Sequence, residues 1–148
     1  MCGPAGSGKS TVARRLVERH GMVRLSFDSE AWNRGFREAP LAPAVHQQIE
    51  DDLRIRLLEL IAHDRDVVLD YAFWSRQIRD QYRTLLAPLG VVPETIYLAP
   101  PRHVVIERMA VRGERDPDDL SLPAELVEEY FDHFEAPTPE EGPLTVID

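Results

Sequence analysis

The residues best suited to chemistry lie at the start of the chain, in the run Gly3-Pro4-Ala5-Gly6-Ser7-Gly8-Lys9-Ser10. This run fits the pattern G-x-x-x-x-G-K-[ST] of a phosphate-binding P-loop. Glycines let the backbone turn with positive φ and bring its N–H groups close to an anion. We therefore predict that the phosphates of a nucleotide are bound by Gly3, Ala5, Gly6, Ser7, Gly8, Lys9, Ser10 and Thr11.

Two side chains of this run carry the chemistry. Lys9 would place its ammonium on the outer phosphates, and the Ser10 hydroxyl is a hard oxygen donor of the kind that Mg²⁺ prefers. A helix expected to begin near Gly8 adds the partial positive charge of its N-terminus. Lys9 is also the only lysine in a chain with 16 arginines. A glycine-rich turn that matches by coincidence is the alternative, and the placement of the single lysine argues against it.

The composition limits the classes of protein to which the chain can belong. A chain of 148 residues with 43% hydrophobic and 29% charged residues predicts one globular domain. No apolar run approaches the roughly 20 residues of a membrane span, and we expect no signal peptide before the loop. Cys2 is the only cysteine, so no disulfide is expected and the cytoplasm is the expected compartment. The net charge of −9 argues against nucleic acid or an anionic membrane as a partner.

Two acidic residues follow predicted strands. Residues 22–27 alternate as a strand does, and Asp28 comes directly after them. Residues 66–70 form a short apolar strand that ends in Asp70, as in a Walker B strand whose carboxylate assists Mg²⁺. Ligands of open α/β sheets bind where the strands end, so we favour a functional role for Asp28. The alternative is that Asp28 caps a short helix through Trp32 and Phe36, and the two roles can hold at once.

Strand and helix signals alternate along the chain, which predicts a parallel sheet flanked by helices. Helices are expected over residues 9–20, 45–62, 76–89, 102–112 and 123–134, and further strands over 95–98 and 144–147. The third of these helices is expected to have Ser75 as its N-cap and Gly90 directly after its end. His46 and His63 flank the second of these helices, where solvated helix ends are favoured over metal binding. Only two residues precede Gly3, where a buried strand is normal. We hypothesise that the true start lies upstream or that the gene product is truncated.

Aromatic residues gather near the predicted edge of the sheet. They would line a pocket for a phosphate acceptor, and core packing is an equal alternative. The candidates are Phe27, Trp32, Phe36, Tyr71, Phe73 and Trp74.

Three arginines, Arg108, Arg112 and Arg115, lie close together beside an acidic stretch. A lid over about residues 108–122 would let one of them neutralise charge on a transferring phosphate, because guanidinium forks suit phosphate oxygens. The alternative is a helix end whose cations complement the helix dipole and nearby acids. The choice among the three arginines is open.

With these residues placed, the chain resembles P-loop kinases of small molecules. That group includes gluconate kinase, chloramphenicol phosphotransferase, zeta-toxin-like kinases and the kinase domain of polynucleotide kinases, and many members are described as AAA-type ATP-binding proteins. The resemblance rests on GPAGSGKST (Gly3–Thr11), RLSFD (Arg24–Asp28), VVLDYAFW (Val67–Trp74), IYLAPPRHVVIERMAVR (Ile96–Arg112) and EYFDHFEAPTPEEG (Glu129–Gly142).

The resemblance implies an α/β three-layer sandwich with a five-stranded parallel sheet in the order 2-3-1-4-5, the first strand being the one that is absent here. It also implies ATP and Mg²⁺ as the phosphoryl-donor system. By the same resemblance Lys9 and Ser10 hold phosphates and metal, and Asp70 is the Walker B acid. Asp28 matches the acid that activates the acceptor hydroxyl, and Arg112 or Arg115 matches the lid arginine.

The leading hypothesis is therefore an ATP-dependent kinase with an alcohol acceptor, an unidentified small molecule. A nucleotide-binding module or remnant that hydrolyses ATP slowly is the second hypothesis. A 5′-hydroxyl nucleic-acid kinase is the third, and the acidic net charge disfavours it. The chain contains no N-K-x-D segment of the kind that recognises guanine, which favours ATP over GTP.

Overall fold

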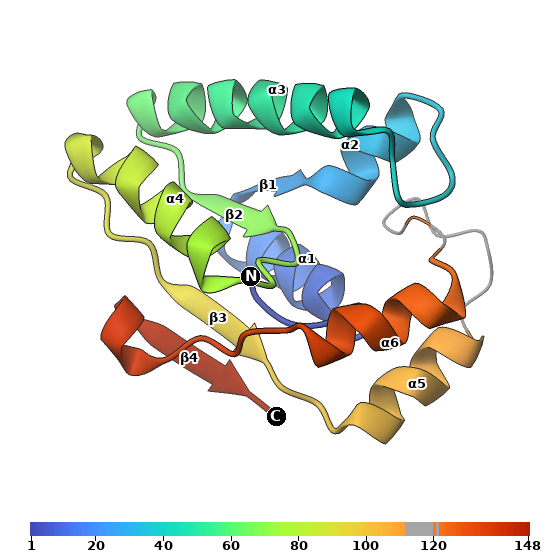
Figure 1. The fold of residues 1–148 in the computed structure, drawn as a ribbon. Helices are drawn as coiled ribbons and strands as arrows, with labels where there is room; N and C mark the ends of the chain where they lie inside the picture. The colour runs from blue at the N-terminus through green and yellow to red at the C-terminus, as the bar shows by residue number, and fades with distance from the viewer. Residues whose placement is uncertain (112–119, 121) are drawn as a thin grey trace. The chain divides into compact units, whose positions relative to one another are not determined.

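The structure, a computed structural model, describes residues 1–111, 120 and 122–148. These residues form two compact units. The first unit takes the described residues of Met1–Lys9, Ala72–Arg112 and Glu125–Asp148, and the second takes those of Ser10–Tyr71 and Gly113–Ala124. Each unit contains one pair of parallel strands (Figure 1). The interpretation of the chain as a single domain stays a prediction.

The second unit is built on the pair β1–β2, in which Val23 lies opposite Val67 and Ser26 lies opposite Asp70. Helices precede β1, follow it directly and precede β2. The elements are α1 (Lys9–His20, which begins one residue before the unit), β1 (Val23–Ser26), α2 (Phe27–Asn33), α3 (Pro43–Ala62) and β2 (Val67–Asp70).

The long helix α3 supplies much of the core of this unit. Ile49, Leu53 and Leu57 recur every four residues, so they share one face of the helix and are buried. Ile55 lies off that face and is 57% exposed. Pro43 stands in the first turn, where its missing N–H costs no helical hydrogen bond. The helix therefore begins two residues before its predicted start and ends where the sequence predicted.

The first unit is built on the pair β3–β4, with Thr95 opposite Leu144. Cys2 adds a single-residue parallel bridge to β3: its N–H donates to the Ile96 carbonyl (2.8 Å), and its carbonyl accepts from the Leu98 N–H (2.9 Å). The elements are α4 (Arg76–Leu86), η1 (Ala87–Leu89), β3 (Thr95–Leu98), α5 (Arg102–Val111), α6 (Ala124–Asp132), η2 (Pro139–Glu141) and β4 (Leu144–Ile147).

The predicted start of helix α4 is confirmed, but the α-helix ends at Leu86 and the 3-10 turn η1 covers the remaining residues to the predicted end at Leu89. The Ser75 hydroxyl accepts a hydrogen bond from the Ile78 N–H at 3.3 Å, which is an N-cap. Gly90 follows the helical segment in the left-handed conformation, with φ of 70°. Tyr82 and Leu86 lie on its buried face.

A buried ion-pair network ties α4 to the segment after α6. The Arg79 guanidinium donates to both Glu141 oxygens at 2.8 Å, and Arg83 reaches the same carboxylate at 3.1 Å. Arg79 also donates to the carbonyls of Phe73 (2.9 Å) and Glu135 (2.8 Å). The side chains of Arg79 and Glu141 are only 3% and 2% exposed. This network therefore fixes a connector that the sequence marks only as acidic and proline-rich.

The mixed α/β fold with parallel strands is confirmed. In the expected order 2-3-1-4-5, strand 1 corresponds to the segment at Cys2, and strands 2 to 5 correspond to β1 to β4. The pairs β1–β2 and β3–β4 therefore agree with the expected neighbours 2-3 and 4-5, and the bridge from Cys2 to β3 agrees with the expected neighbours 1-4. The structure excludes one alternative: Asp28 is not the N-cap of the short helix. Ser26 is the N-cap of α2, because its hydroxyl accepts from the Ser29 N–H at 3.2 Å. No helix among the described residues is long and apolar enough to cross a bilayer.

Candidate functional site

The loop between Cys2 and α1 has a backbone that requires glycine. Gly3, Gly6 and Gly8 all have positive φ, at 148°, 75° and 97°. A Cβ at Gly3 would lie 2.7 Å from the Leu98 carbonyl oxygen, and one at Gly6 would lie 3.0 Å from the Met109 side chain. Such a run of residues turns successive N–H groups toward one concave side, the arrangement that binds anions.

Lys9 is the first residue of α1 and closes the loop. Its ammonium donates to the carbonyls of Gly3 (2.9 Å) and Pro4 (2.8 Å), so the positive charge is held against the loop backbone. Ser10 follows it in the first turn of the same helix and is partly exposed. The loop, the helix N-terminus and the ammonium together favour a bound anion with several oxygens.

One arginine from α5 reaches the loop. Arg108 donates from Nη1 to the Ser7 carbonyl at 3.5 Å, which is a long hydrogen bond. Arg112 and Arg115, which the resemblance matches to the lid arginine, lie outside the described residues. Arg108 is the third member of that cluster, and reasoning from the residues alone left the choice among the three open.

In the second unit, two predicted acids lie at the same edge of the β1–β2 pair. Asp70 is the last residue of β2 and pairs in register with Ser26, the last residue of β1. Asp28 follows two residues later, in the first turn of α2. The Asp70 side chain is only 2% exposed, and Arg24 donates to its Oδ2 from Nε (2.9 Å) and Nη2 (2.5 Å). This partnership was not predicted, because the two residues are 46 positions apart.

The residues predicted to hold a metal have suitable chemistry. The Ser10 hydroxyl and the Asp70 carboxylate are hard oxygen donors. Among the described residues no group of three or more His, Cys, Asp or Glu side chains could hold a metal ion by itself. Mg²⁺ at nucleotide sites is usually held by one or two protein ligands together with the phosphates. The donor set therefore fits a magnesium ion that is shared with a nucleotide.

A family model described as an AAA domain matches residues 1–137, which is most of the chain. The chain belongs to this AAA domain family. A comparison with curated protein sequences finds no match.

Solved structures with the same fold as this AAA domain include three P-loop proteins. A sugar kinase from Janibacter sp. HTCC2649 superposes with a TM-score of 0.69 at 22% identity, over 99% of this chain and 82% of that one. Chaetomium thermophilum Kti12, in complex with ADP-AlF3, gives 0.68 at 19% identity, over 99% and 86%. A gluconokinase from Sinorhizobium meliloti 1021 gives 0.66 at 23% identity, over 99% and 79%. These likenesses support the fold expected from the P-loop.

Three of the aromatic residues that were named for an acceptor pocket of this AAA domain have packing partners of their own. The Phe27 ring lies 4.5 Å from that of His46, and the Arg37 guanidinium lies 3.9 Å above Trp32. Phe73 is buried and meets the Tyr82 ring edge-on at 5.0 Å. For Phe73 this favours the alternative of core packing. The other aromatics named for an acceptor pocket stay candidates.

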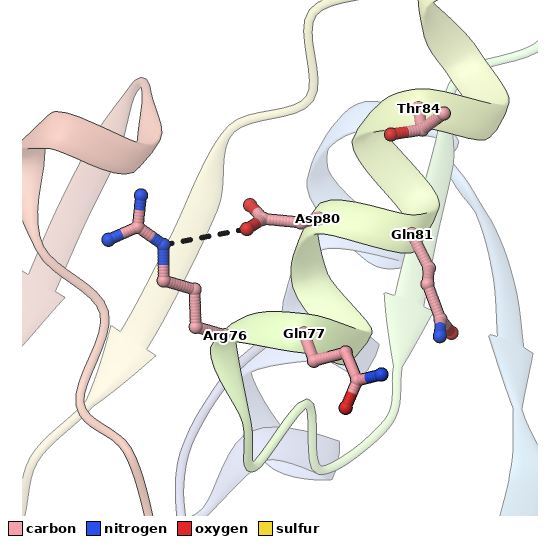
Figure 2. Close-up of a pocket in the computed structure, with 5 residues that line it drawn as sticks. All are labelled: Arg76, Gln77, Asp80, Gln81 and Thr84. Atoms are coloured by element: carbon pink, nitrogen blue, oxygen red, sulfur yellow. Dashed lines mark ion pairs between the residues drawn. The ribbon is translucent and has the colours of Figure 1, made fainter.

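An open hollow of about 610 Å³ lies along α4 of the AAA domain (Figure 2). Its lining residues all belong to that helix: Arg76, Gln77, Asp80, Gln81 and Thr84. The Arg76 and Asp80 side chains form an ion pair across one turn at 3.4 Å (Figure 2). None of these residues is among the predicted site residues, and the hollow has a wall on one side only. It is therefore not a candidate for the nucleotide site.

Proposed function

We propose that the chain binds ATP and transfers its γ-phosphate to a hydroxyl group of a small molecule. The geometry of the loop carries this proposal: three glycines with positive φ precede a helix whose first residue is the chain's only lysine. Phosphoryl transfer needs little covalent chemistry from the protein. It needs the reactants to be positioned and the phosphate charge to be neutralised.

On the donor side, the Lys9 ammonium would give up its hydrogen bonds to the carbonyls of Gly3 and Pro4 and donate to phosphate oxygens of ATP instead. The loop N–H groups would hold the remaining oxygens. Arg108, which already reaches the Ser7 carbonyl, is available to neutralise charge as the phosphate transfers. Ser10 and Asp70 would hold Mg²⁺, which when bound neutralises phosphate charge. Arg112 and Arg115 stay candidates for the same neutralising role.

On the acceptor side, we assign Asp28 as the group that orients or deprotonates the hydroxyl. Ser26 already caps α2, so capping does not account for a carboxylate at this position. Asp28 also stands just beyond the carboxyl end of a parallel strand, where ligands of α/β sheets bind. A carboxylate here can act as a general base if it comes within hydrogen-bond reach of the acceptor.

Asp28→Asn tests the proposal against a matched control, Glu30→Gln. Both changes remove one negative charge from α2, but the Glu30 carboxylate pairs with Arg34 at 2.8 Å. ADP production would be measured with Mg·ATP across a panel of sugars, sugar acids, nucleosides and amino alcohols, and nucleotide binding would be measured alongside.

We expect Asp28→Asn to reduce the rate of acceptor-stimulated ADP production by at least about 100-fold and to leave ATP binding unchanged. Glu30→Gln should keep both. Equal loss of binding and transfer in Asp28→Asn would make Asp28 structural. ADP production that no acceptor stimulates would favour a slow ATPase module. Stimulation by 5′-hydroxyl oligonucleotides alone would favour the nucleic-acid kinase.

A further inference from the structure

Arg24 and Asp70 form a buried ion pair within the second unit. Both Arg24 nitrogens that contact the carboxylate, Nε at 2.9 Å and Nη2 at 2.5 Å, donate to the same oxygen, Oδ2. The two side chains are 15% and 2% exposed. Among the described residues no other hydrogen bond to the Asp70 side chain occurs. The guanidinium is therefore the cation that compensates this buried carboxylate.

The strand register explains the contact. Arg24 lies opposite Val68, and Ser26 lies opposite Asp70. Because side chains alternate between the faces of a strand, Arg24 and Asp70 lie on the same face as diagonal neighbours. Long side chains span that separation. The pairing thus depends on two ordered strands.

We propose that Arg24 keeps Asp70 from binding a free divalent cation, so that the metal arrives with the nucleotide. The proposal rests on the proposed function, which makes Asp70 a ligand of Mg²⁺. A guanidinium and a divalent cation that approach one carboxylate repel each other, and the repulsion is strong where water is largely excluded. A nucleotide brings its own negative charge, which offsets that repulsion. Arg24 is in this sense a positioning residue.

The experiment uses Mn²⁺ alone as the probe, without nucleotide. Binding to the full chain would be measured from the electron paramagnetic resonance signal of free Mn²⁺. The variants are Arg24→Gln, Asp70→Asn and the double variant. Arg34→Gln is the matched control, because it removes another arginine of the same unit, one that pairs with Glu30 and Asp52 at the surface.

We expect wild type and Arg34→Gln to bind Mn²⁺ weakly and Arg24→Gln to bind it at least about tenfold more tightly. The double variant should lose that gain, because the gain requires the carboxylate. Equal affinity of wild type and Arg24→Gln would overturn the proposal. A gain that persists in the double variant would also overturn it, since the metal would then bind elsewhere.

Two further points keep the test decisive. If Arg24→Gln does not fold, Arg24→Met replaces it: it also removes the positive charge, so the same gain in Mn²⁺ affinity is expected, and no gain would overturn the proposal. The readout involves neither ATP nor phosphoryl transfer. The proposed kinase activity can therefore fail while this inference holds, and the reverse is equally possible.

Discussion

Replacing Glu141 by glutamine should remove a large part of the chain's acid sensitivity. Arg79 donates two hydrogen bonds of 2.8 Å to the carboxylate and Arg83 donates a third at 3.1 Å. The Glu141 side chain is 2% exposed, so water screens these contacts little. The hydrogen bonds from Arg79 are the main reason that the pKa of Glu141 falls from 4.5 to about 2.

The magnitude follows from linkage between protonation and folding. A carboxyl group whose pKa is lower in the folded chain than in the unfolded chain stabilises the fold above the unfolded pKa. That stability is lost as the pH falls toward the folded pKa. For Glu141 the two pKa values differ enough to contribute about 3 kcal/mol at neutral pH, lost between about pH 5 and pH 2.

The assay is urea unfolding followed by circular dichroism, at a series of pH values from neutral to acid. At neutral pH Glu141→Gln should cost about 3–5 kcal/mol, because it leaves the Arg79 guanidinium buried without its carboxylate. The gap to wild type should narrow by about 3 kcal/mol as the pH falls, since wild-type Glu141 becomes neutral too.

Glu18→Gln is the control. Glu18 is exposed, and no ion pair to it occurs among the described residues, so its removal should leave the pH dependence close to that of wild type. The reasoning is refuted if wild type and Glu141→Gln lose stability in parallel as the pH falls. That result, a constant difference in the free energy of unfolding between the two proteins, would mean that the network contributes packing but no linked protonation.

Two further substitutions test other parts of the account by the same unfolding assay. Gly3→Ala should cost at least about 2 kcal/mol more than Gly21→Ala: both glycines have positive φ, but only at Gly3 would a Cβ meet backbone, 2.7 Å from the Leu98 carbonyl. Equal costs would show that the loop can shift away. Arg34→Ala should cost less than about 1 kcal/mol, and less still in high salt, because its ion pairs with Glu30 and Asp52 are at the surface; a larger, salt-independent loss would contradict this.

Local signals predicted the fold well. The bounds predicted for α1, β3 and β4 match those of the structure, because each element has a clear apolar pattern between strong breakers. The cap at Ser75 and the position of Gly90 directly after the helical segment were also predicted, since both depend on a few adjacent residues. The loop was identified for the same reason: its pattern is contiguous.

Long-range partnerships could not be predicted. Arg79 and Glu141 are 62 positions apart, and nothing in the composition of either segment pairs them. The Arg24–Asp70 pair depends on a strand register that the sequence does not specify. The alternative that Asp28 caps the helix fails for a local reason: Ser26 and Asp28 are both good capping residues, and the strand ends one residue earlier than its alternation predicted.

The central claim is that the loop around Lys9 binds a nucleotide, and calorimetric titration of Mg·ADP into wild type and Lys9→Ala tests it most directly. We expect saturable one-site binding to wild type and at least about tenfold weaker binding to Lys9→Ala, with circular dichroism showing that the variant is folded. At about 100 times its Kd the ligand should also stabilise wild type by about 2.7 kcal/mol. No binding to folded wild type, or equal binding to the two proteins, would contradict the account.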